Sequence, residues 1–258
     1  MPRTLKLTIA YDGSDFAGWQ RQANARSVQA EVEDAIARIE RTPITVLGAG
    51  RTDAGVHAAA QVASVRVECD MTPHALQRAL NAILPQDVRL TAIEDQTPGF
   101  NARHDARSKT YHYWIWNGMA LPPMLRRQAW HVPQALDVDA MRRGAEALVG
   151  EHDFAAFQGT GSDIKTTVRR ILVSRVCQVD VSHLVASPSR DRLLRYEVTG
   201  TGFLRHMVRN IVGTLVDVGR RRRPSRDVAA ILASRQRQNA SATAPPQGLI
   251  LWKVEYGP

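Results

Sequence analysis

The sequence has very little cysteine, since Cys69 and Cys177 are the only two among 258 residues. This scarcity excludes a cysteine-rich zinc site and argues against a disulfide framework, and it suits a reducing compartment. Long apolar runs are also missing, because no stretch approaches the roughly 20 residues that a membrane-spanning helix needs. The amino terminus lacks the apolar core of a signal peptide. We therefore expect a cytoplasmic protein that does not enter a membrane.

Lysine is the other scarce residue. Lys6, Lys109, Lys165 and Lys253 are the only four lysines, so 30 of the 34 basic residues are arginines, and the formal net charge is +9. Arginine binds phosphate through a planar fork of donors, which favours nucleic acid as the partner, although a solvated basic surface has the same composition. The four arginines at residues 220–223 suit either an RNA phosphate contact or the solvated end of a helix.

The pattern of apolar residues predicts an α+β fold. Strands and amphipathic helices occur together, with neither the strict alternation of a parallel sheet nor an all-helical pattern. The predicted helices begin at Ser27, Thr72, Asp139, Phe203 and Pro224, and the predicted strands cover residues 1–11, 44–47, 61–68, 110–116, 171–181, 193–199 and 249–256. Two similar halves are expected, residues 1–105 and 106–258. The weakest order is expected at residues 187–192 and 239–247.

A glycine-framed motif, GAGRTDAG at residues 48–55, lies between two predicted strands. Its glycines allow backbone angles closed to other residues and let a large ligand approach the main chain, and loops held by a sheet often carry catalysis. The motif is neither a phosphate-binding P-loop nor a dinucleotide fingerprint. An ordinary turn, with Asp53 bonded to its own backbone and Arg51 in a surface ion pair, accounts for the same residues. If the loop is functional, the Asp53 carboxylate is the candidate for the chemistry.

Residues 50–57, GRTDAGVH, resemble the signature loop of the tRNA pseudouridine synthase A family. Three further regions are similar to segments of the same family: residues 11–13 with 18–22, residues 100–103, and residues 203–213. Together they run nearly from end to end. The resemblance implies a pseudouridine synthase fold, in which a mixed, largely antiparallel sheet is flanked by helices and built from two similar halves around a central cleft.

The resemblance also implies an activity, the conversion of uridine to pseudouridine in the anticodon stem-loop of tRNA, where the family targets uridines 38, 39 and 40. It implies no cofactor and no metal, and a homodimer in which both subunits grip one tRNA. Asp53 matches the catalytic aspartate of the family. A carboxylate suits this reaction as nucleophile or base, and attack on the base, attack on the sugar and removal of a sugar proton all stay open.

Six other residues are matched to family positions. Arg209 matches the basic active-site residue, which would lower the pKa of Asp53 and keep it ionised beside RNA. Tyr111 matches a tyrosine that lies against the target base after this base has turned out of its stack. The hydroxyl of that tyrosine can serve proton transfer. The substrate-binding set comprises Tyr111, Arg51, Leu249, Arg205 and His206. In that set Leu249 resembles the apolar residue beneath the base, and Arg205 stands where the family often has histidine.

Two other functions compete with this interpretation. A non-catalytic, arginine-rich RNA-binding protein would use arginines for phosphates and aromatic side chains for bases. A hydrolase would need the carboxylates of Asp53, Asp12 and Asp15 to converge on a divalent metal. A separate zinc site is not expected, because the spacing of the remaining candidate ligands matches no zinc pattern. Those candidates are His57, His104, Asp105 and His112.

Overall fold

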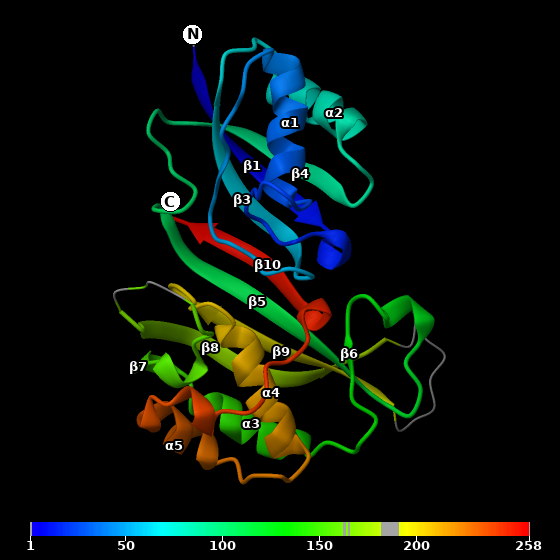
Figure 1. Cartoon of the computed structure of the whole chain (residues 1–258), viewed down its shortest axis with the longest axis vertical. Coiled ribbons are helices and arrows are strands. Elements are labelled where there is room, and N and C mark those ends of the chain that lie inside the picture. The colour runs from blue at the N-terminus through cyan, green and yellow to red at the C-terminus, as the bar shows by residue number, and fades with distance from the viewer. Residues whose placement is uncertain (1, 162–163, 165, 182–190, 258) are drawn as a thin grey trace. The chain divides into compact units, whose positions relative to one another are not determined.

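The computed structural model describes residues 2–161, 164, 166–181 and 191–257. The chain forms two compact units, Met1–Lys109 with Ile250–Pro258, and Thr110–Leu249 (Figure 1). Each unit contains strands and helices, which confirms the α+β class. Within the described ranges, no helix combines the length and the apolar character that crossing a bilayer requires. Most of the loop expected at residues 187–192 lies outside the described residues.

The first unit is organised around four neighbouring strands in the order β4-β1-β3-β10, with β2 paired to β3. Strand β1 is antiparallel to both β3 and β4, whereas β10 runs parallel to β3 through the pairs Ile250↔His57 and Leu251↔Ala58. The chain end thus returns to the unit in which it began. The strands are β1 (Arg3–Tyr11), β2 (Leu47–Gly48), β3 (His57–Val67), β4 (Val88–Gln96) and β10 (Leu249–Tyr256).

Two helices belong to the first unit, α1 (Val28–Glu40) and α2 (Pro73–Ile83). Both begin where the sequence predicts. The Thr72 hydroxyl caps α2 by accepting the Ala75 N–H, whereas Ser27 occupies the N-cap of α1 without a side-chain cap bond. The apolar faces of these helices and alternate residues of β1 are buried together in the core of the unit. The buried residues include Leu5, Leu7, Ile9, Val28, Val32, Ile36, Leu76 and Leu80.

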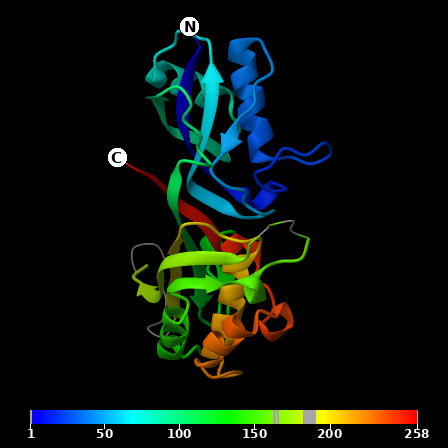
Figure 2. The same ribbon diagram turned by 90° about the vertical axis from the view of Figure 1, so that its left-hand side faces the viewer.

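The second unit has the strand order β5-β9-β8-β7, with β6 paired to β5. Strands β7, β8 and β9 are antiparallel, so the sheet of the protein is mixed and mostly antiparallel, as predicted. Helix α3 packs against β8 and α4, as can be followed in Figures 1 and 2. The elements are β5 (Ala106–Asn117), β6 (Trp130–His131), α3 (Val138–Glu146), β7 (Gly150–Asp153), β8 (Val168–Val179), β9 (Arg192–Gly200), α4 (Met207–Gly219) and α5 (Asp227–Ser234).

Three local predictions are wrong. The strand predicted at residues 44–47 is reduced to β2, because the backbone of Val46 is bonded to side chains of α1. The helix predicted from Phe203 begins at Met207, since His206 has a left-handed conformation with φ of 58°. Residues 239–247 are well anchored: the Ser241 N–H donates to Thr214 Oγ1, and the Thr243 hydroxyl donates to Asn210 Oδ1.

Candidate active site

Asp53 lies in the first unit, in the loop that joins β2 to β3. It is partly buried, and its carbonyl accepts the Val56 N–H at 3.1 Å, which closes the turn leading into β3. Arg51, two residues earlier, is exposed. The loop is therefore open at Arg51 and more enclosed at Asp53.

The chain that enters this loop is held by a buried polar network on α1. Glu33 Oε1 accepts the Val46 N–H at 3.0 Å, and Gln29 Nε2 donates to the Val46 carbonyl at 3.0 Å. Arg21 completes the network, because its Nε donates to Glu33 Oε2 at 2.6 Å. Glu33 and Gln29 are both buried. Buried polar groups that are fully paired restrict the backbone to one arrangement, so the loop starts from a fixed point.

Trp19 contacts the same loop at positions closer to Asp53 than Val46 is. Its backbone N–H donates to the Thr52 carbonyl at 3.1 Å, and its indole lies so close to Gly48 that a Cβ there would come within 2.6 Å of the ring. Gly18 has φ of +106°, and a Cβ there would come within 2.6 Å of the Thr52 carbonyl oxygen. Only glycine allows both the left-handed backbone angle and the close approach without strain. The aromatic ring and the loop are thereby packed directly together.

The residue before Asp53 is also held by its side chain. The hydroxyls of Thr52 and Tyr11 are 2.7 Å apart, and both residues are buried. Gln61 is fully buried beside them, donates to the Gly50 carbonyl at 2.9 Å and bonds the Tyr11 hydroxyl. Burial raises the pKa of Tyr11 well above its usual range, so the hydroxyl stays protonated as a donor. Asp53 thus follows a residue that is fixed through both its main chain and its side chain.

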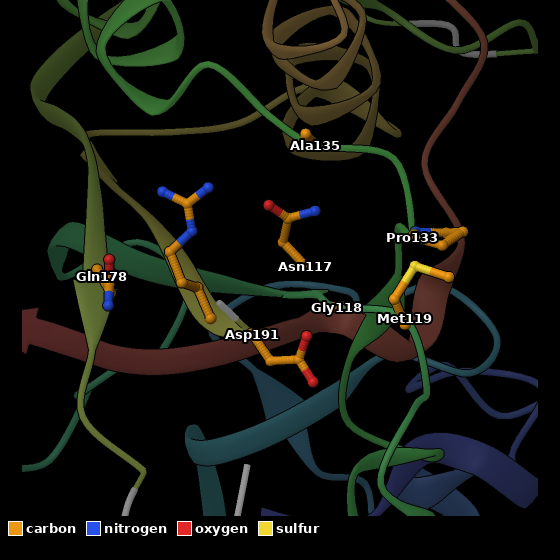
Figure 3. Close-up of a pocket in the computed structure, with 8 residues that line it drawn as sticks. Asn117, Gly118, Met119, Pro133, Ala135, Gln178 and Asp191 are labelled. Carbon is orange, nitrogen blue, oxygen red and sulfur yellow. The ribbon is translucent and has the colours of Figure 1, made fainter. Parts of the chain in front are cut away.

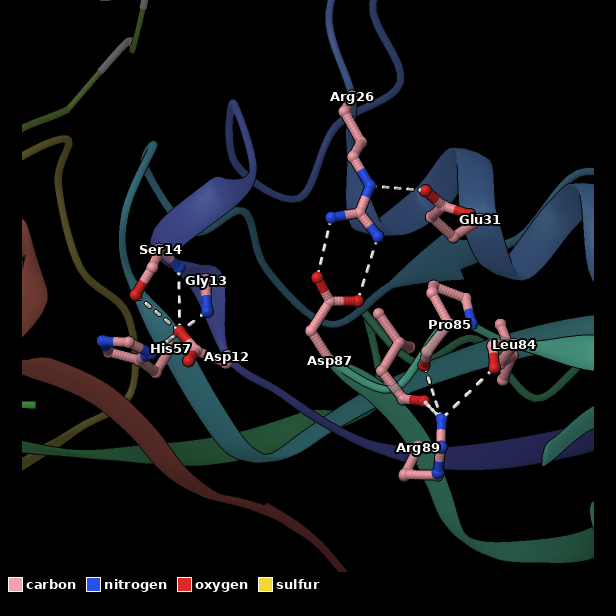
Figure 4. Close-up of polar contacts among 11 residues, drawn as sticks. Asp12, Gly13, Ser14, Arg26, Glu31, His57, Leu84, Pro85, Asp87 and Arg89 are labelled. Carbon is pink, nitrogen blue, oxygen red and sulfur yellow. Dashed lines mark hydrogen bonds and ion pairs between the residues drawn. The ribbon is translucent and has the colours of Figure 1, made fainter. Parts of the chain in front are cut away.

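Asp12, one of the three carboxylates of the hydrolase alternative, has structural partners. Asp12 caps a short helix, η1 (Gly13–Asp15): its Oδ1 accepts the backbone N–H and the hydroxyl of Ser14, and lies 3.1 Å from His57 Nδ1 (Figure 4). His57 is buried, and its Nδ1 accepts the Gly13 N–H at 3.0 Å. In the part of the chain that the structure describes, no three His, Cys, Asp or Glu side chains are placed to hold a metal ion.

Tyr111 lies in the second unit, on β5, and is buried. The edge of its ring meets the ring of Phe203, with the centroids 5.0 Å apart and the planes at 78°. Such edge-to-face pairs fix the orientation of an aromatic side chain. Phe203 belongs to the segment that contains Arg205 and His206, so this contact ties the tyrosine strand to the entry of α4.

Arg209 lies in the first turn of α4 and is partly buried. Its Nε donates to the Ala244 carbonyl at 2.8 Å, and its own carbonyl accepts the Ala244 N–H at 3.1 Å. These two bonds attach the segment that leads into β10 to the helix. Leu249, at the start of β10, is buried. Arg209 therefore has a structural task in addition to any chemical one.

Arg205 and His206 occupy the turn before α4. Arg205 is exposed, and its guanidinium donates to the carbonyls of Thr160 and Gly161 at 3.0 and 3.2 Å. The imidazole of His206 lies over Gly159, where a Cβ would come within 2.7 Å of Nδ1. Both residues thus contact the segment at 159–161.

A separate pocket of about 470 Å³ opens in the second unit (Figure 3). Its lining includes Asn117, Asp191 and Arg192, and none of the predicted site residues. The amide of Asn117 donates to the carbonyls of Val132 and Gln134, both at 2.8 Å, so it supports the wall of the pocket. We assign no ligand to this pocket.

Sequence reasoning missed the residues that support the site. Tyr11, Trp19 and Gln61 hold the Asp53 loop, and Phe203 holds Tyr111. Tyr11, Trp19 and Phe203 lie inside segments that resemble the family, which was the available signal. The contacts of these three residues with the Asp53 loop and with Tyr111 span 29 to 92 positions along the chain, and local sequence patterns do not show pairings at such separations.

Comparison with known proteins identifies the family. A family model described as tRNA pseudouridine synthase matches residues 7–105 and 145–257. The tRNA pseudouridine synthase A of Solidesulfovibrio magneticus is 46% identical over 98% of this chain and 91% of its own length. That of Geobacter sulfurreducens is 42% identical over 98% of this chain and 100% of its own length. The chain belongs to the tRNA pseudouridine synthase family.

One solved structure is a more distant match. The crystal structure of the archaeal box H/ACA sRNP Nop10-Cbf5 complex contains a chain 17% identical to this one, with a TM-score of 0.31. The match covers 82% of this chain and 44% of that chain, so this chain spans less than half the length of its counterpart.

Proposed function

We propose that this protein isomerises uridine to pseudouridine in the anticodon stem-loop of tRNA, at uridines 38, 39 and 40, with Asp53 as the catalytic residue. The main support is the position of Asp53 in the GRTDAGVH loop. This loop lies within the region matched by the family model. Side chains of β1 and β3 hold Thr52 and Gly50 within it, and α1 holds Val46, four residues before it. A carboxylate on a rigid loop can act repeatedly in one geometry.

The reaction rearranges bonds within one nucleotide. The bond between the sugar and N1 of uracil breaks, the base turns, and a bond forms between the sugar and C5. The C5 proton is lost and N1 gains a proton, so substrate and product contain the same atoms. No electrons are gained or lost overall, and the balance requires no redox cofactor. Asp53 starts the sequence as an anion, by attacking the base, attacking the sugar or removing a sugar proton.

Arg209, Tyr111 and Leu249 complete the proposed site. Arg209 supplies a positive charge that stabilises the Asp53 carboxylate beside a polyanion. Tyr111 lies against the extruded base and serves proton transfer, and Leu249 packs beneath the base. Tyr111 lies between the two segments that the family model matches, so that match does not support its role. The support comes from the sequence resemblance and from the fixed orientation of Tyr111 against Phe203.

Arg51, Arg205 and His206 are proposed to bind the RNA. Arg51 and Arg205 are exposed, as residues that contact phosphates must be in the free protein. Arg205 reaches the carbonyls at 160 and 161 with its guanidinium, and the remaining N–H groups of a guanidinium can still serve a phosphate.

We also propose that the protein is a cytoplasmic homodimer whose two subunits hold one tRNA. The support is the family resemblance together with a net charge of +9, which suits a long RNA contact. Sedimentation equilibrium should give about twice the chain mass of 28.6 kDa, and a monomer at micromolar concentration would refute the dimer.

Formation of pseudouridine is the direct test of the proposed function. The purified protein is incubated with unmodified tRNA transcript in excess chelator, without added cofactor, and the RNA is digested to nucleosides. We expect pseudouridine at positions 38 to 40 in the presence of chelator. Tight tRNA binding without product on several tRNAs would favour the RNA-binding alternative, and product that depends on a restored metal would contradict the proposed chemistry.

The hydroxyl pair beside Asp53 gives a second testable effect. Tyr11→Phe removes one hydroxyl and leaves Thr52 and Gln61 with unpaired buried groups, which costs about 1 to 3 kcal/mol of stability. Because the Asp53 loop loses a fixed point, we expect kcat to fall roughly tenfold while KM for tRNA stays within about twofold. Steady-state kinetics measure kcat and KM, and thermal unfolding measures the loss of stability.

Tyr196→Phe is the matched control, because Tyr196 is also buried and its hydroxyl lies 2.9 Å from that of Ser174, on strands β9 and β8. It should lose similar stability and keep most of its kcat. An equal fall in kcat for both variants would mean that Tyr11 acts only through general stability.

A further inference from the structure

Lys109 lies next to the loop that carries Asp53, although no sequence motif singles it out. It is the last residue of the continuous part of the first unit, within β5. Its side chain crosses the face of Gly50: the Cδ, Cε and Nζ atoms are 3.8, 3.5 and 3.7 Å from the place where a Cβ on Gly50 would be. Gly50 is three positions before Asp53, so the ammonium group lies beside the catalytic loop.

The other described lysines have acidic partners. Lys6 Nζ lies 3.0 Å from a Glu94 carboxylate oxygen, and Lys253 Nζ lies 2.6 Å from one of Glu255. Lys109 has no such ion pair among the residues that the structure describes. Burial, together with the nearby cation Arg103, lowers the pKa of Lys109.

A partly buried ammonium beside a second cation is an unfavourable arrangement in the free protein. An anion that arrives at this place gains the attraction of both cations and restores part of the lost solvation. The proposed substrate is a polyanion with one phosphodiester per nucleotide. Gly50 contributes no side chain of its own, so the surface around the ammonium is left low enough for an RNA backbone to approach.

We propose that Lys109 is a phosphate-binding residue whose ammonium donates to a non-bridging phosphodiester oxygen of the RNA and positions the RNA backbone beside the Asp53 loop. This inference extends the proposed function and rests on it. Lys109 is a positioning residue in this assignment, because its effect on the reaction comes through the place of the RNA.

The salt dependence of RNA binding tests this role. Each phosphate contact releases counterions, so log K falls as log salt rises. Loss of one contact makes this negative slope shallower by about 0.7 to 0.9. Binding of unmodified tRNA transcript is measured between about 50 and 200 mM salt in the Asp53→Asn background, which prevents turnover during titration. Lys109→Met removes the charge at similar length, Lys109→Arg keeps it, and Lys253→Met is the control for a lysine of the same unit that is paired with glutamate.

We expect Lys109→Met to weaken binding about fivefold to tenfold at low salt. It should also make the salt slope shallower by the amount that corresponds to about one phosphate contact. Lys109→Arg should restore the slope, and Lys253→Met should leave it unchanged. An unchanged slope in Lys109→Met, a failure of the arginine to restore it, or an equal change in Lys253→Met overturns the proposal.

The two proposals fail in different ways. If wild-type protein binds tRNA and forms no pseudouridine, the proposed function fails, while a reduced slope in Lys109→Met still supports the phosphate contact. If pseudouridine forms normally and the slope does not change, the function is supported and the role of Lys109 is refuted. If the protein does not bind tRNA, both are overturned. A fall in kcat with an unchanged slope also refutes the contact, since it indicates packing against the loop.

Discussion

Replacement of Asp53 by asparagine should abolish pseudouridine formation and leave the fold intact. The amide has the size of the carboxylate, but it has no negative charge and cannot act as a nucleophile or base at this position. Because a positioned base or nucleophile contributes about 10² to 10⁴ in rate, we expect a loss of at least about 10³ in the single-turnover rate. Affinity for tRNA should stay within about threefold, as measured by filter binding at fixed salt.

Asp70→Asn is the matched control for this change. Asp70 is an exposed loop residue of the same unit, and its replacement alters the net charge by the same amount. It should retain full activity. If Asp53→Asn kept more than about a tenth of the wild-type rate, the chemistry would have to be assigned to another residue, because that loss is too small for a primary catalytic group.

Replacement of Arg209 by methionine should give the second largest loss. Methionine keeps an unbranched apolar stem but removes the positive charge and the Nε donor to the Ala244 carbonyl. Under the proposed role of Arg209, loss of its positive charge from the site should lower the single-turnover rate by about 10² or more. Arg209→Lys keeps the charge without the planar donor fork, so its rate should lie between those of wild type and Arg209→Met.

Arg237→Met separates the chemical role of Arg209 from its structural one. The Arg237 guanidinium donates to the carbonyls of Ala240 and Ser241 at 3.2 and 3.0 Å, so it anchors the same segment that Arg209 holds at Ala244. We expect Arg237→Met to lower the thermal unfolding midpoint and to keep the rate within about threefold. If its rate fell as far as that of Arg209→Met, the loss in both variants would come from displacement of the segment that leads to β10.

The amino-acid sequence by itself determined the features that depend on neighbours in the chain. The apolar spacing after Ser27 and the Thr72-Pro73 start predicted where α1 and α2 begin. Helical periodicity and capping depend on residues a few positions apart, so the sequence shows both directly. The loop at residues 48–55 was found from its glycines and its carboxylate alone. The resemblance of four separate segments indicated the family, which the comparisons confirm.

Only the tertiary structure decided the features that depend on contacts between distant residues. Residues 44–46 have the β-branched composition of a strand, yet Val46 bonds to Glu33 and Gln29, because side chains of α1 satisfy its backbone groups. The Tyr11–Thr52 pair and the ammonium of Lys109 over Gly50 join positions 41 and 59 residues apart. Local periodicity does not predict such pairings, because their stability comes from burial and from hydrogen bonds that exist only after the chain has folded.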